Sequence, residues 1–162
     1  MSEPLIIRPI DTTRAEVKNT ICSLIDNSFA SSQSFSSQRA SACLLANSLG
    51  WGIFRKQQLY GAIFCEHVAP RVIYIPLLVV WPLYFRQGIG SALFFFLLKR
   101  FPTCQFYGDV AQHNIAAMRL YTRQFNCQVL STWGNTASGQ MTTLWHPPRI
   151  TADKYKRLVL NT

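Results

Sequence analysis

The sequence predicts a single-domain α/β protein built on a mixed sheet of about seven strands with about four helices. Its 162 residues suffice for one domain with a full core but not for two. It is 49% hydrophobic and 14% charged, which indicates a packed globule. Strand-like and helix-like segments alternate in the order strand, two helices, three strands, helix, strand, helix, two strands, which predicts a mixed α/β fold.

The first half contributes three of the predicted strands. The segment "PLIIRPID" alternates and is β-branched, as a strand should be. In "TRAEVKNTICSLI" the apolar residues recur on one helical face, and Thr13 and Glu16 have capping-box spacing. A serine-rich connection follows, and then "RASACLLANSL" predicts a short helix. Two strands around a turn near residues 56–58 are predicted by "WGIFRKQQLYGAIFCEHV".

The second half alternates strands and helices. The segment "RVIYIPLLVV" has no polar alternation after its arginine, so we expect a strand buried on both faces, with a bulge or break near Pro76. After the next helix come a strand in "QFYGDV" and a helix in "NIAAMRLYTRQF", with Asn114 as its N-cap. Two strands close the fold, joined by a loop containing Gly134 and Gly139, and residues 150–162 form a basic tail or short helix.

The formal charge of +9 favours an anionic partner such as a nucleotide cofactor, RNA or an acidic surface. Acidic side chains are scarce, and between Asp26 and Asp153 the only carboxylates are Glu66 and Asp109. Carboxylate catalysis in the middle of the chain must therefore use one of these two residues.

The cysteine and histidine patterns argue against disulfides and metal sites. Five scattered cysteines without a CxxC pair predict reduced thiols in a cytoplasmic protein. The three histidines lack ligand spacing, so no metal is expected. The longest apolar run, residues 72–85, has 14 residues and two prolines. A membrane span needs ~20 apolar residues, so we expect no membrane partner.

The segment "RQGIGS", residues 86–91, lies where a strand gives way to a helix. Backbone amides at a helix N-terminus attract anions, glycines allow close approach, and Arg86 adds a positive charge. The alternative is a tight turn whose glycines only relieve steric crowding. The segment is neither a P-loop, because "SA" follows Gly90, nor a dinucleotide fingerprint, because the spacing to the strand is wrong.

Two motifs together resemble a known family. The segment "LLVVWPLYFRQGIGSALF" resembles the central motif of the GNAT superfamily of N-acetyltransferases, and "DVAQHNIAAMRLY" resembles its second motif through Asn114, Ala117, Leu120 and Tyr121. "IIRPID" and "LYGAIF" resemble the first and third strands, so the resemblance covers nearly the whole chain.

The resemblance implies acetyl-CoA as co-substrate. It implies that turn amides hold the diphosphate, that a splay between strands 4 and 5 exposes backbone groups to the pantetheine arm, and that Asn114 and Tyr121 lie by the thioester. The implied cofactor-binding residues are Leu78, Val79, Val80, Phe85, Arg86, Gln87, Gly88, Ile89, Gly90, Ser91, Asn114 and Tyr121.

The resemblance also implies catalytic roles. Tyr121 would be the acid that protonates the leaving thiolate, the alternative being an ordinary core tyrosine. Histone-acetylating members carry a glutamate base where Tyr74 stands, and members resembling the ribosomal-protein N-terminal acetyltransferase carry one where Asp109 stands. Asp109 could act through a water, or be a structural carboxylate bonding backbone or Arg119, with Glu66 in reserve.

Three departures from the family pattern leave room for other functions, the first being that Tyr74 stands where the central strand would carry a glutamate base. Phe85 replaces the usual Gln or Arg, and "QFNC" follows the second motif in place of Gly-Phe, so Asn126 is expected to take the left-handed C-cap with one residue inserted. Specificity should reside in residues 28–37 and 134–139, where Phe29, Phe35 and Trp133 could line an acceptor groove. We expect a peptide, protein or small primary amine rather than a polycation.

Three further alternatives stay open. One is acetylation of aminoacyl-tRNA, with Arg149, Lys154, Lys156 and Arg157 on phosphates. A second is a catalytically weak module that only binds acyl-CoA. A solvated tail explains the basic residues of the first alternative, so nucleic acid is not the favoured partner. The third alternative concerns assembly, because the sequence leaves open whether the chain forms a homodimer.

Overall fold

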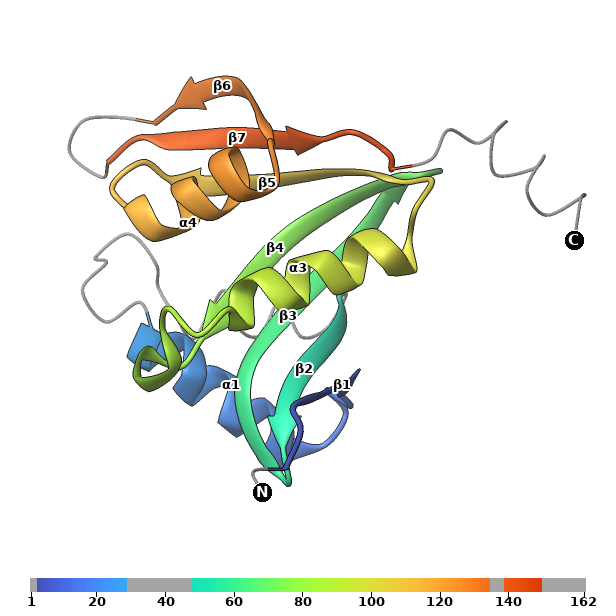
Figure 1. The fold of residues 1–162 in the computed structure, drawn as a ribbon, viewed down its shortest axis with the longest axis vertical. Helices are drawn as coiled ribbons and strands as arrows, with labels where there is room; N and C mark the ends of the chain where they lie inside the picture. The colour runs from blue at the N-terminus through green and yellow to red at the C-terminus, as the bar shows by residue number, and fades with distance from the viewer. Residues whose placement is uncertain (1–2, 29–47, 135–138, 150–162) are drawn as a thin grey trace, which may run out of the picture. The chain divides into compact units, whose positions relative to one another are not determined.

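The computed structural model describes residues 3–28, 48–134 and 139–149 (Figure 1). Strands and helices follow one another in the predicted order, and the helices are interspersed among seven strands. The elements are β1 (Ile6–Pro9), α1 (Ala15–Ser28), β2 (Leu49–Arg55), β3 (Gln58–Ala69), β4 (Val72–Val80), the 3-10 turn η1 (Pro82–Tyr84), α3 (Ile89–Arg100), β5 (Gln105–Ala111), α4 (Ile115–Arg119), the π-turn η2 (Leu120–Gln124), β6 (Gln128–Trp133) and β7 (Met141–His146).

All seven strands belong to one mixed sheet with the order β1-β2-β3-β4-β5-β7-β6. β1 with β2, β2 with β3, β5 with β7 and β6 with β7 pair antiparallel, whereas β4 and β5 run parallel. The predicted mixed α/β fold is therefore confirmed. The helix predicted in "RASACLLANSL" lies largely outside the described residues, and the splay between the fourth and fifth strands stays a prediction.

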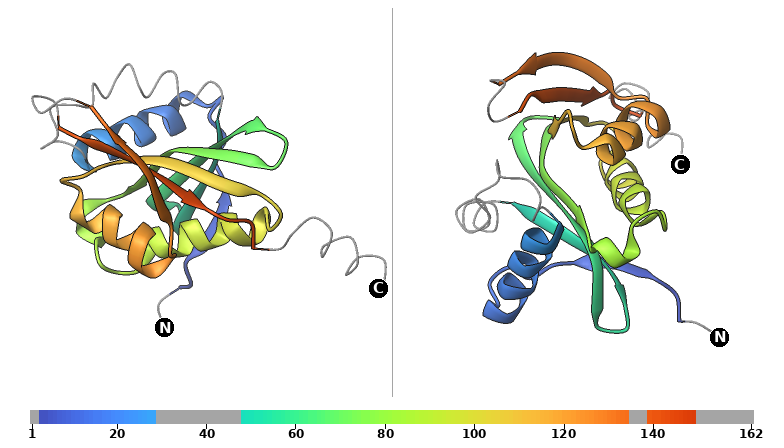
Figure 2. Two further views of the ribbon diagram at one scale, coloured as in Figure 1. Left: turned by 90° about the horizontal axis from the view of Figure 1, so that it is seen from above. Right: turned by 90° about the vertical axis from the view of Figure 1, so that its left-hand side faces the viewer.

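The chain forms two compact units, each made of two segments. The first unit comprises Met1–Glu66 and Ile75–Phe94, and the second comprises His67–Tyr74 and Phe95–Thr162. The core of the first unit joins one face of α1 to apolar side chains of β3 and β4, and Figure 2 shows α1 running alongside these strands. Its members are Ile21, Leu24, Ile25, Leu59, Ala62, Phe64, Leu77 and Val79.

The start of α1 differs from the capping box that the sequence predicts. The helix begins at Ala15, and its first backbone bond runs from the Lys18 amide to the Arg14 carbonyl. Thr13 therefore precedes the cap, and both its amide and its hydroxyl donate to Asp11, at 3.0 and 2.5 Å. Asp11 provides the local turn because a carboxylate accepts both bonds at once.

β4 is not buried on both faces, as its apolar sequence suggested. Ile73, Ile75, Leu77 and Val79 are buried, while the residues between them, including Pro76, are half-buried. Strand side chains alternate between faces, so only one face of β4 is fully enclosed by the described residues. Pro76 lies within a continuous nine-residue strand, on the less buried face.

In the second unit, β5, β7 and β6 present two unlike faces. Phe106, Val110 and Leu144 are buried on one face. The alternate side chains of β5 and β7, among them Asp109 and Thr143, are half-buried on the other face. β6 ends the sheet, and all six of its residues are exposed.

Candidate active site

The predicted anion-binding segment, Phe85–Ser91, is called the anion turn below. The 3-10 turn η1 leads into it, and Tyr84 of η1 stacks on Tyr60 of β3 with ring centroids 3.9 Å apart. The Tyr84 hydroxyl also accepts a hydrogen bond from Gln58 at 2.7 Å. These contacts fix the entry of the anion turn to the rigid sheet of the first unit.

The anion turn has an unusual backbone. Arg86 has φ of 62° and Gly88 has φ of 76°, so two residues with left-handed φ are separated by a single residue, Gln87. Such a conformation is strained for arginine and easy for glycine. Left-handed residues alternating with others turn successive amides toward one side, which is how backbone nests bind anions. Residues 85–88 are all exposed, so the turn is accessible among the described residues.

The helix that follows supplies further donors. The Ala92 amide donates to the Gly88 carbonyl at 2.9 Å, the first backbone bond of α3. The amides of Ile89 and Gly90 therefore precede the intrahelical ladder, and the positive end of the helix dipole adds to their attraction for an anion. A Cβ placed on Gly88 would meet no heavy atom within 4 Å, which leaves open space beside the turn.

Gly61 of β3 is a supporting residue that the sequence analysis missed. A Cβ at this position would lie 2.9 Å from Ile89 Cγ2 and 2.9 Å from the Val79 carbonyl oxygen. The missing side chain thus lets β3, the end of β4 and the start of α3 approach closely. A glycine inside a strand is the signal that could have identified it.

We expect Gly61→Ala to destabilise the protein by about 1–3 kcal/mol, because the Val79 carbonyl cannot move without disturbing β4. Gly52→Ala is the matched control. Its Cβ would meet only the ends of the Leu59 and Phe54 side chains, which can rotate away. Urea unfolding of both variants measures the difference, and equal losses would show that the backbone contact at Gly61 is unimportant.

The end of β4 carries the residues predicted to contact the pantetheine arm. Val79 is buried in the first unit's core, whereas Leu78 and Val80 are half-buried. The Val80 carbonyl accepts a hydrogen bond from the Ser28 hydroxyl at 2.8 Å. Ser28, the last residue of α1, therefore positions the strand end, a role that sequence reasoning did not assign.

In the second unit, Asn114 caps α4 as predicted. Its side-chain oxygen accepts from the Ala117 amide at 3.1 Å, so this oxygen is already used within the helix cap. After only five α-helical residues, the chain widens into the π-turn, and the Phe125 amide donates to the Leu120 carbonyl at 3.2 Å. Asn126 has φ of 54°, which confirms the predicted left-handed cap.

Tyr121 lies in this π-turn and is half-buried. Burial raises the pKa of its hydroxyl above the ordinary value, and the neighbouring Cys127 raises it further. The hydroxyl therefore keeps its proton throughout the neutral range, as a proton donor must. π-turns occur frequently at functional sites, which agrees with the role that the family motif implies.

Cys127 makes stability depend on pH. Its amide donates to the Tyr121 carbonyl at 2.8 Å, and burial raises the pKa of its thiol to about 12. An unfolded thiol titrates near ~8.5, so the native state holds a proton that the unfolded state loses above that pH. The stabilisation is complete below pH ~8.5 and declines as the pH rises toward about 12.

We expect the free energy of unfolding of the wild type to fall between pH 8.5 and 9.5, and to fall less in Cys127→Ala. The comparison uses the slope with pH, because removing the buried side chain also changes stability at pH 7. Urea unfolding at three pH values measures both slopes. Identical slopes would mean that Cys127 titrates alike in both states.

Asp109 lies on β5 and accepts two hydroxyl donors. Tyr74 of β4 donates to its Oδ2 at 2.9 Å, and Thr143 of β7 donates to its Oδ1 at 2.5 Å. The Thr143 oxygen in turn accepts from the Trp133 indole nitrogen of β6 at 3.1 Å. Arg119, the partner suggested by nearness in sequence, is not among these partners. The structure thus unites Asp109 with Tyr74, the residue at the other family position for a base.

Glu66, the reserve candidate for the base, has a local hydrogen-bond partner. Glu66 accepts from the Ser48 hydroxyl at 2.8 Å, and the His67 ring packs edge-on against Phe101. His113 is exposed just before Asn114. The anion turn lies in the first unit, whereas Asp109, Asn114 and Tyr121 lie in the second. Phe29, Phe35, Lys154, Lys156 and Arg157 lie outside the described residues.

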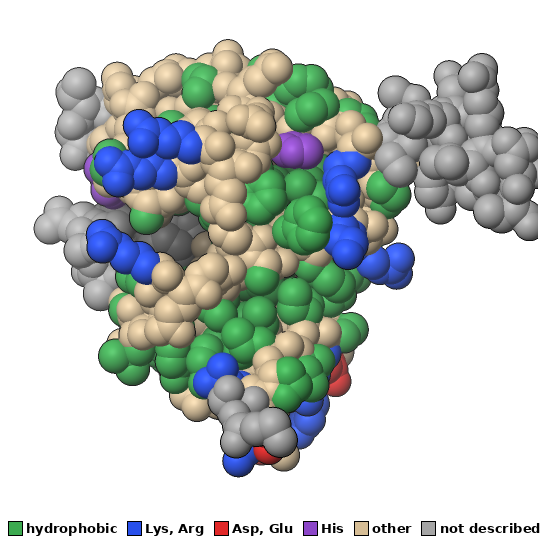
Figure 3. Space-filling view, in the orientation of Figure 1, with side chains coloured by type: hydrophobic (Ala, Val, Ile, Leu, Met, Phe, Trp, Pro, Cys, Tyr) green, Lys and Arg blue, Asp and Glu red, His purple; other side chains and the backbone are tan. Residues whose placement is uncertain are grey.

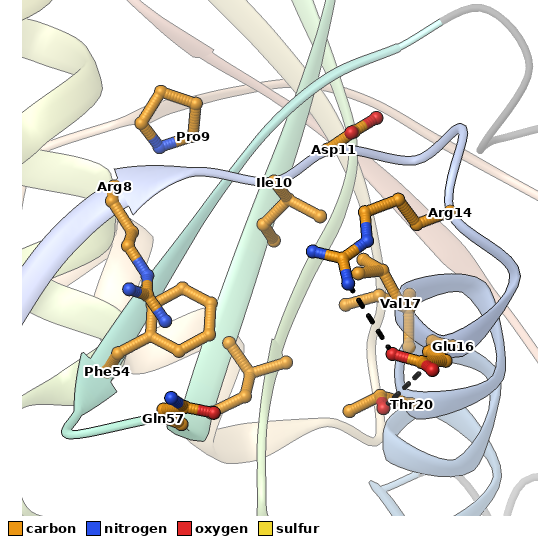
Figure 4. Close-up of a pocket in the computed structure, with 12 residues that line it drawn as sticks. Arg8, Pro9, Ile10, Asp11, Arg14, Glu16, Val17, Thr20, Phe54 and Gln57 are labelled. Atoms are coloured by element: carbon orange, nitrogen blue, oxygen red, sulfur yellow. Dashed lines mark hydrogen bonds and ion pairs between the residues drawn. The ribbon is translucent and has the colours of Figure 1, made fainter.

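A cleft of about 530 Å³ lies between β1, the start of α1 and the turn after β2 (Figure 4), and none of the predicted site residues is among those that line it. Its cations already have partners, because Arg8 stacks 4.0 Å above the Phe54 ring and Arg14 pairs with Glu16 at 3.6 Å. Apolar side chains such as Ile10 and Val17 also line it. The cleft therefore has no evident catalytic chemistry.

The described part of the chain contains neither a cluster of metal ligands nor a membrane-spanning helix. Its His, Cys, Asp and Glu side chains form no group of three or more that could hold a metal ion. No helix within residues 3–28, 48–134 and 139–149 has the length and apolarity to cross a membrane.

Several solved structures share this fold at low sequence identity. The ribosomal-protein-S18-alanine N-acetyltransferase of Escherichia coli matches with a TM-score of 0.73 and 16% identity, over 93% of this chain and 97% of that chain. An aminoglycoside 6'-acetyltransferase type Ii matches with a TM-score of 0.72 and 14% identity, over 88% and 96%. The PaiA N-acetyltransferase of Thermoplasma acidophilum, in complex with coenzyme A, matches at 0.64 and 17%, over 86% and 98%.

A comparison with curated proteins found no match. The family model for the acetyltransferase (GNAT) family matches residues 19–126, more than half of the sequence and both of the motifs described above. The chain therefore belongs to the acetyltransferase (GNAT) family.

Proposed function

We propose that this protein is an acetyl-CoA-dependent N-acetyltransferase that transfers an acetyl group to a primary amine. The observation that carries the proposal is the anion turn, with left-handed Arg86 and Gly88 directly before the N-terminus of α3. Acetyl-CoA brings a diphosphate for such a turn and an activated thioester for the transfer. We propose one catalytic domain spanning residues 1–162.

The residues of the anion turn fit this co-substrate. The open space beside Gly88 leaves room for a diphosphate, and Arg86 supplies a cation at an exposed position. Because the donors are mainly backbone amides, Phe85 in place of the usual Gln or Arg does not remove them. Leu78 to Val80 would hold the pantetheine arm through backbone groups, with the strand end steadied by Ser28.

Transfer requires one bond to form and one to break. The acceptor nitrogen, once deprotonated, bonds to the acetyl carbon, the carbon–sulfur bond breaks, and the thiolate leaves with the electron pair. Asp109 takes the ammonium proton, directly or through a water, and Tyr121 gives a proton to the thiolate. After the attack the nitrogen loses its second proton, which returns to the Tyr121 oxygen through solvent and leaves a neutral amide. The raised pKa keeps Tyr121 protonated at neutral pH but also makes its hydroxyl a weaker acid.

We propose a cytoplasmic location, which is supported by the four described cysteines forming no disulfide bond. The aminoacyl-tRNA alternative gains no support from the described residues, since Arg149 stacks over Phe95 and the other basic residues of that segment lie outside the description. Membrane and metal partners have no role in the proposal.

The test has two stages. Calorimetric titration with acetyl-CoA should give saturable binding with one site per chain. Incubation with acetyl-CoA and a panel of primary amines, followed by mass spectrometry, should then give an acetylated amine and free CoA in equal amounts. Binding without any transfer would favour an acyl-CoA-binding module, and absence of binding by the folded protein would overturn the proposal.

A further inference from the structure

One face of the second unit gathers aromatic side chains around a single carboxylate. The strand register places Asp109 opposite Thr143, Tyr107 opposite Trp145 and Tyr74 opposite Tyr107. Since side chains of one strand alternate between faces, these residues share one face of the sheet. We call this surface the Asp109 face, and its members are Tyr74, Gln105, Tyr107, Asp109, Trp133, Thr143 and Trp145.

Hydrogen bonds hold the polar ends of these side chains within the face. Tyr74 and Thr143 donate to Asp109, and Trp133 donates to Thr143. A second pair of hydrogen bonds has Gln105 as its acceptor. The Gln105 side-chain oxygen accepts from the Trp145 indole at 3.0 Å and from the Tyr107 hydroxyl at 3.3 Å. Each of these aromatic residues is thus oriented through its polar atom, and each is only partly buried or exposed.

Within the part of the chain that the structure describes, no Lys or Arg forms an ion pair with the Asp109 carboxylate. Its two partners are hydroxyl groups, which stabilise the carboxylate without cancelling its charge. It is half-buried, and an ion pair at a partly buried site is screened less by salt than an exposed pair. An ammonium bound there would lie beside aromatic rings, which attract cations through their faces.

The surrounding charge limits how many positive charges a ligand can carry. Asp109 is the one carboxylate among the described residues of the second unit, while its cations are Arg71, Lys99, Arg100, Arg119, Arg123 and Arg149. Figure 3 likewise shows few Asp or Glu side chains on the face that it displays, and many Lys and Arg. A ligand with several ammonium groups would meet one attractive partner and a repulsive background.

We infer that the Asp109 face binds the acceptor, and that the acceptor is a primary amine with one ammonium group next to an aromatic or large apolar substituent. That the bound amine is the acetyl acceptor rests on the proposed function, whereas the binding of the amine itself does not depend on acetyl transfer. Asp109 pairs with the ammonium, and the aromatic residues contact the substituent. Trp133, half exposed at the edge of the sheet, forms one border of this surface.

The experiment uses three probes and the fluorescence of the protein's own tryptophans. Phenethylamine carries one ammonium and one ring, 2-phenylethanol has the ring without the charge, and spermidine has three ammonium groups without a ring. Each probe is titrated into the full-length protein, with and without saturating CoA. Phenethylamine should change the fluorescence saturably, and we expect 2-phenylethanol and spermidine to bind at least tenfold more weakly.

The variants locate the site. Asp109→Asn keeps the side-chain shape and one of the two oxygens that accept from Tyr74 and Thr143, and it removes the charge, so we expect the Kd for phenethylamine to rise at least tenfold. Glu16→Gln is the matched control, because it removes an exposed carboxylate of the first unit and should leave the Kd unchanged. Trp133→Phe should reduce the fluorescence change, because it deletes one of the two tryptophans of the face and leaves Trp145 as the other reporter.

The outcomes separate this inference from the proposed function. Equal affinity for phenethylamine and 2-phenylethanol, tighter binding of spermidine, or an unchanged Kd in Asp109→Asn would each overturn the inference. So would a lack of phenethylamine binding both with and without CoA. Amine binding that depends on Asp109 in a protein that fails to bind acetyl-CoA would leave the inference standing and overturn the proposed function.

Discussion

Tyr121→Phe is expected to lower kcat by about 10²-fold or more while leaving acetyl-CoA affinity within about twofold. A positioned general acid typically contributes ~10²–10⁴-fold to the rate. Phenylalanine keeps the ring in the π-turn and removes only the hydroxyl that burial keeps protonated. The loss should therefore fall on the step in which the thiolate leaves, and not on binding.

Steady-state kinetics with a reactive amine, together with calorimetric titration of acetyl-CoA, measure the two quantities. Tyr84→Phe is the matched control, because it keeps the ring that stacks on Tyr60 and removes a hydroxyl whose side-chain partners are Gln58 and Tyr60. We expect its kcat to stay within about twofold of the wild type. If Tyr121→Phe retained full kcat, a water or another donor would have to protonate the thiolate.

Gly88→Asp is expected to abolish acetyl-CoA binding, whereas Gly88→Asn should weaken it far less. Both substitutions place a side chain of the same shape in the open space beside the anion turn, and both require the left-handed backbone that Asn tolerates best after glycine. The pair therefore differs mainly in charge. A carboxylate beside amides that await a diphosphate repels it and competes for the same donors.

Calorimetry with acetyl-CoA measures both affinities, and circular dichroism checks that both variants fold. We expect the Kd of Gly88→Asp to exceed that of Gly88→Asn by at least tenfold, with the difference shrinking as salt is added, because screening weakens repulsion between exposed charges. Similar affinities for the two variants would place the diphosphate elsewhere. They would also remove the observation on which the proposed function depends.

The sequence predicts the features that depend on neighbouring residues in the chain. The anion turn, the Asn114 cap and the left-handed Asn126 all follow from local backbone preferences, and the structure has them where the motifs indicate. The capping box at α1 fails for a local reason as well. Asp11, two residues before Thr13, accepts from both the amide and the hydroxyl of Thr13 and so holds this residue in a turn before the helix begins at Ala15.

Features that depend on strand pairing could not be predicted in the same way. The partners of Asp109 lie 35 and 34 residues away, on β4 and β7. Periodicity indicates that a segment is a strand, but it does not indicate which strand becomes its neighbour or in what register. For β4, an entirely apolar sequence gives no sign of which face remains less buried, because that depends on what packs against it.

Gly61 is a second case in which the sequence does not reveal contacts between segments that are distant in the chain. Its sequence context, "LYGAIF", predicts a strand correctly but does not reveal that two other segments pass within contact distance of the missing side chain. Close approach is a property of three segments at once. Only the coordinates identify Gly61 as a support for the start of α3.

The π-turn at Leu120–Gln124 offers a way to understand how this chain tolerates an extra residue. Relative to the family pattern, one residue is inserted between Tyr121 and the left-handed cap. In a continuous α-helix an insertion would rotate everything beyond it by about 100°, because each turn holds ~3.6 residues. A single wide turn absorbs the extra residue locally. The extra residue at this point of the chain therefore leaves the position of β6 unchanged, and the register of β6 with β7 does not have to shift.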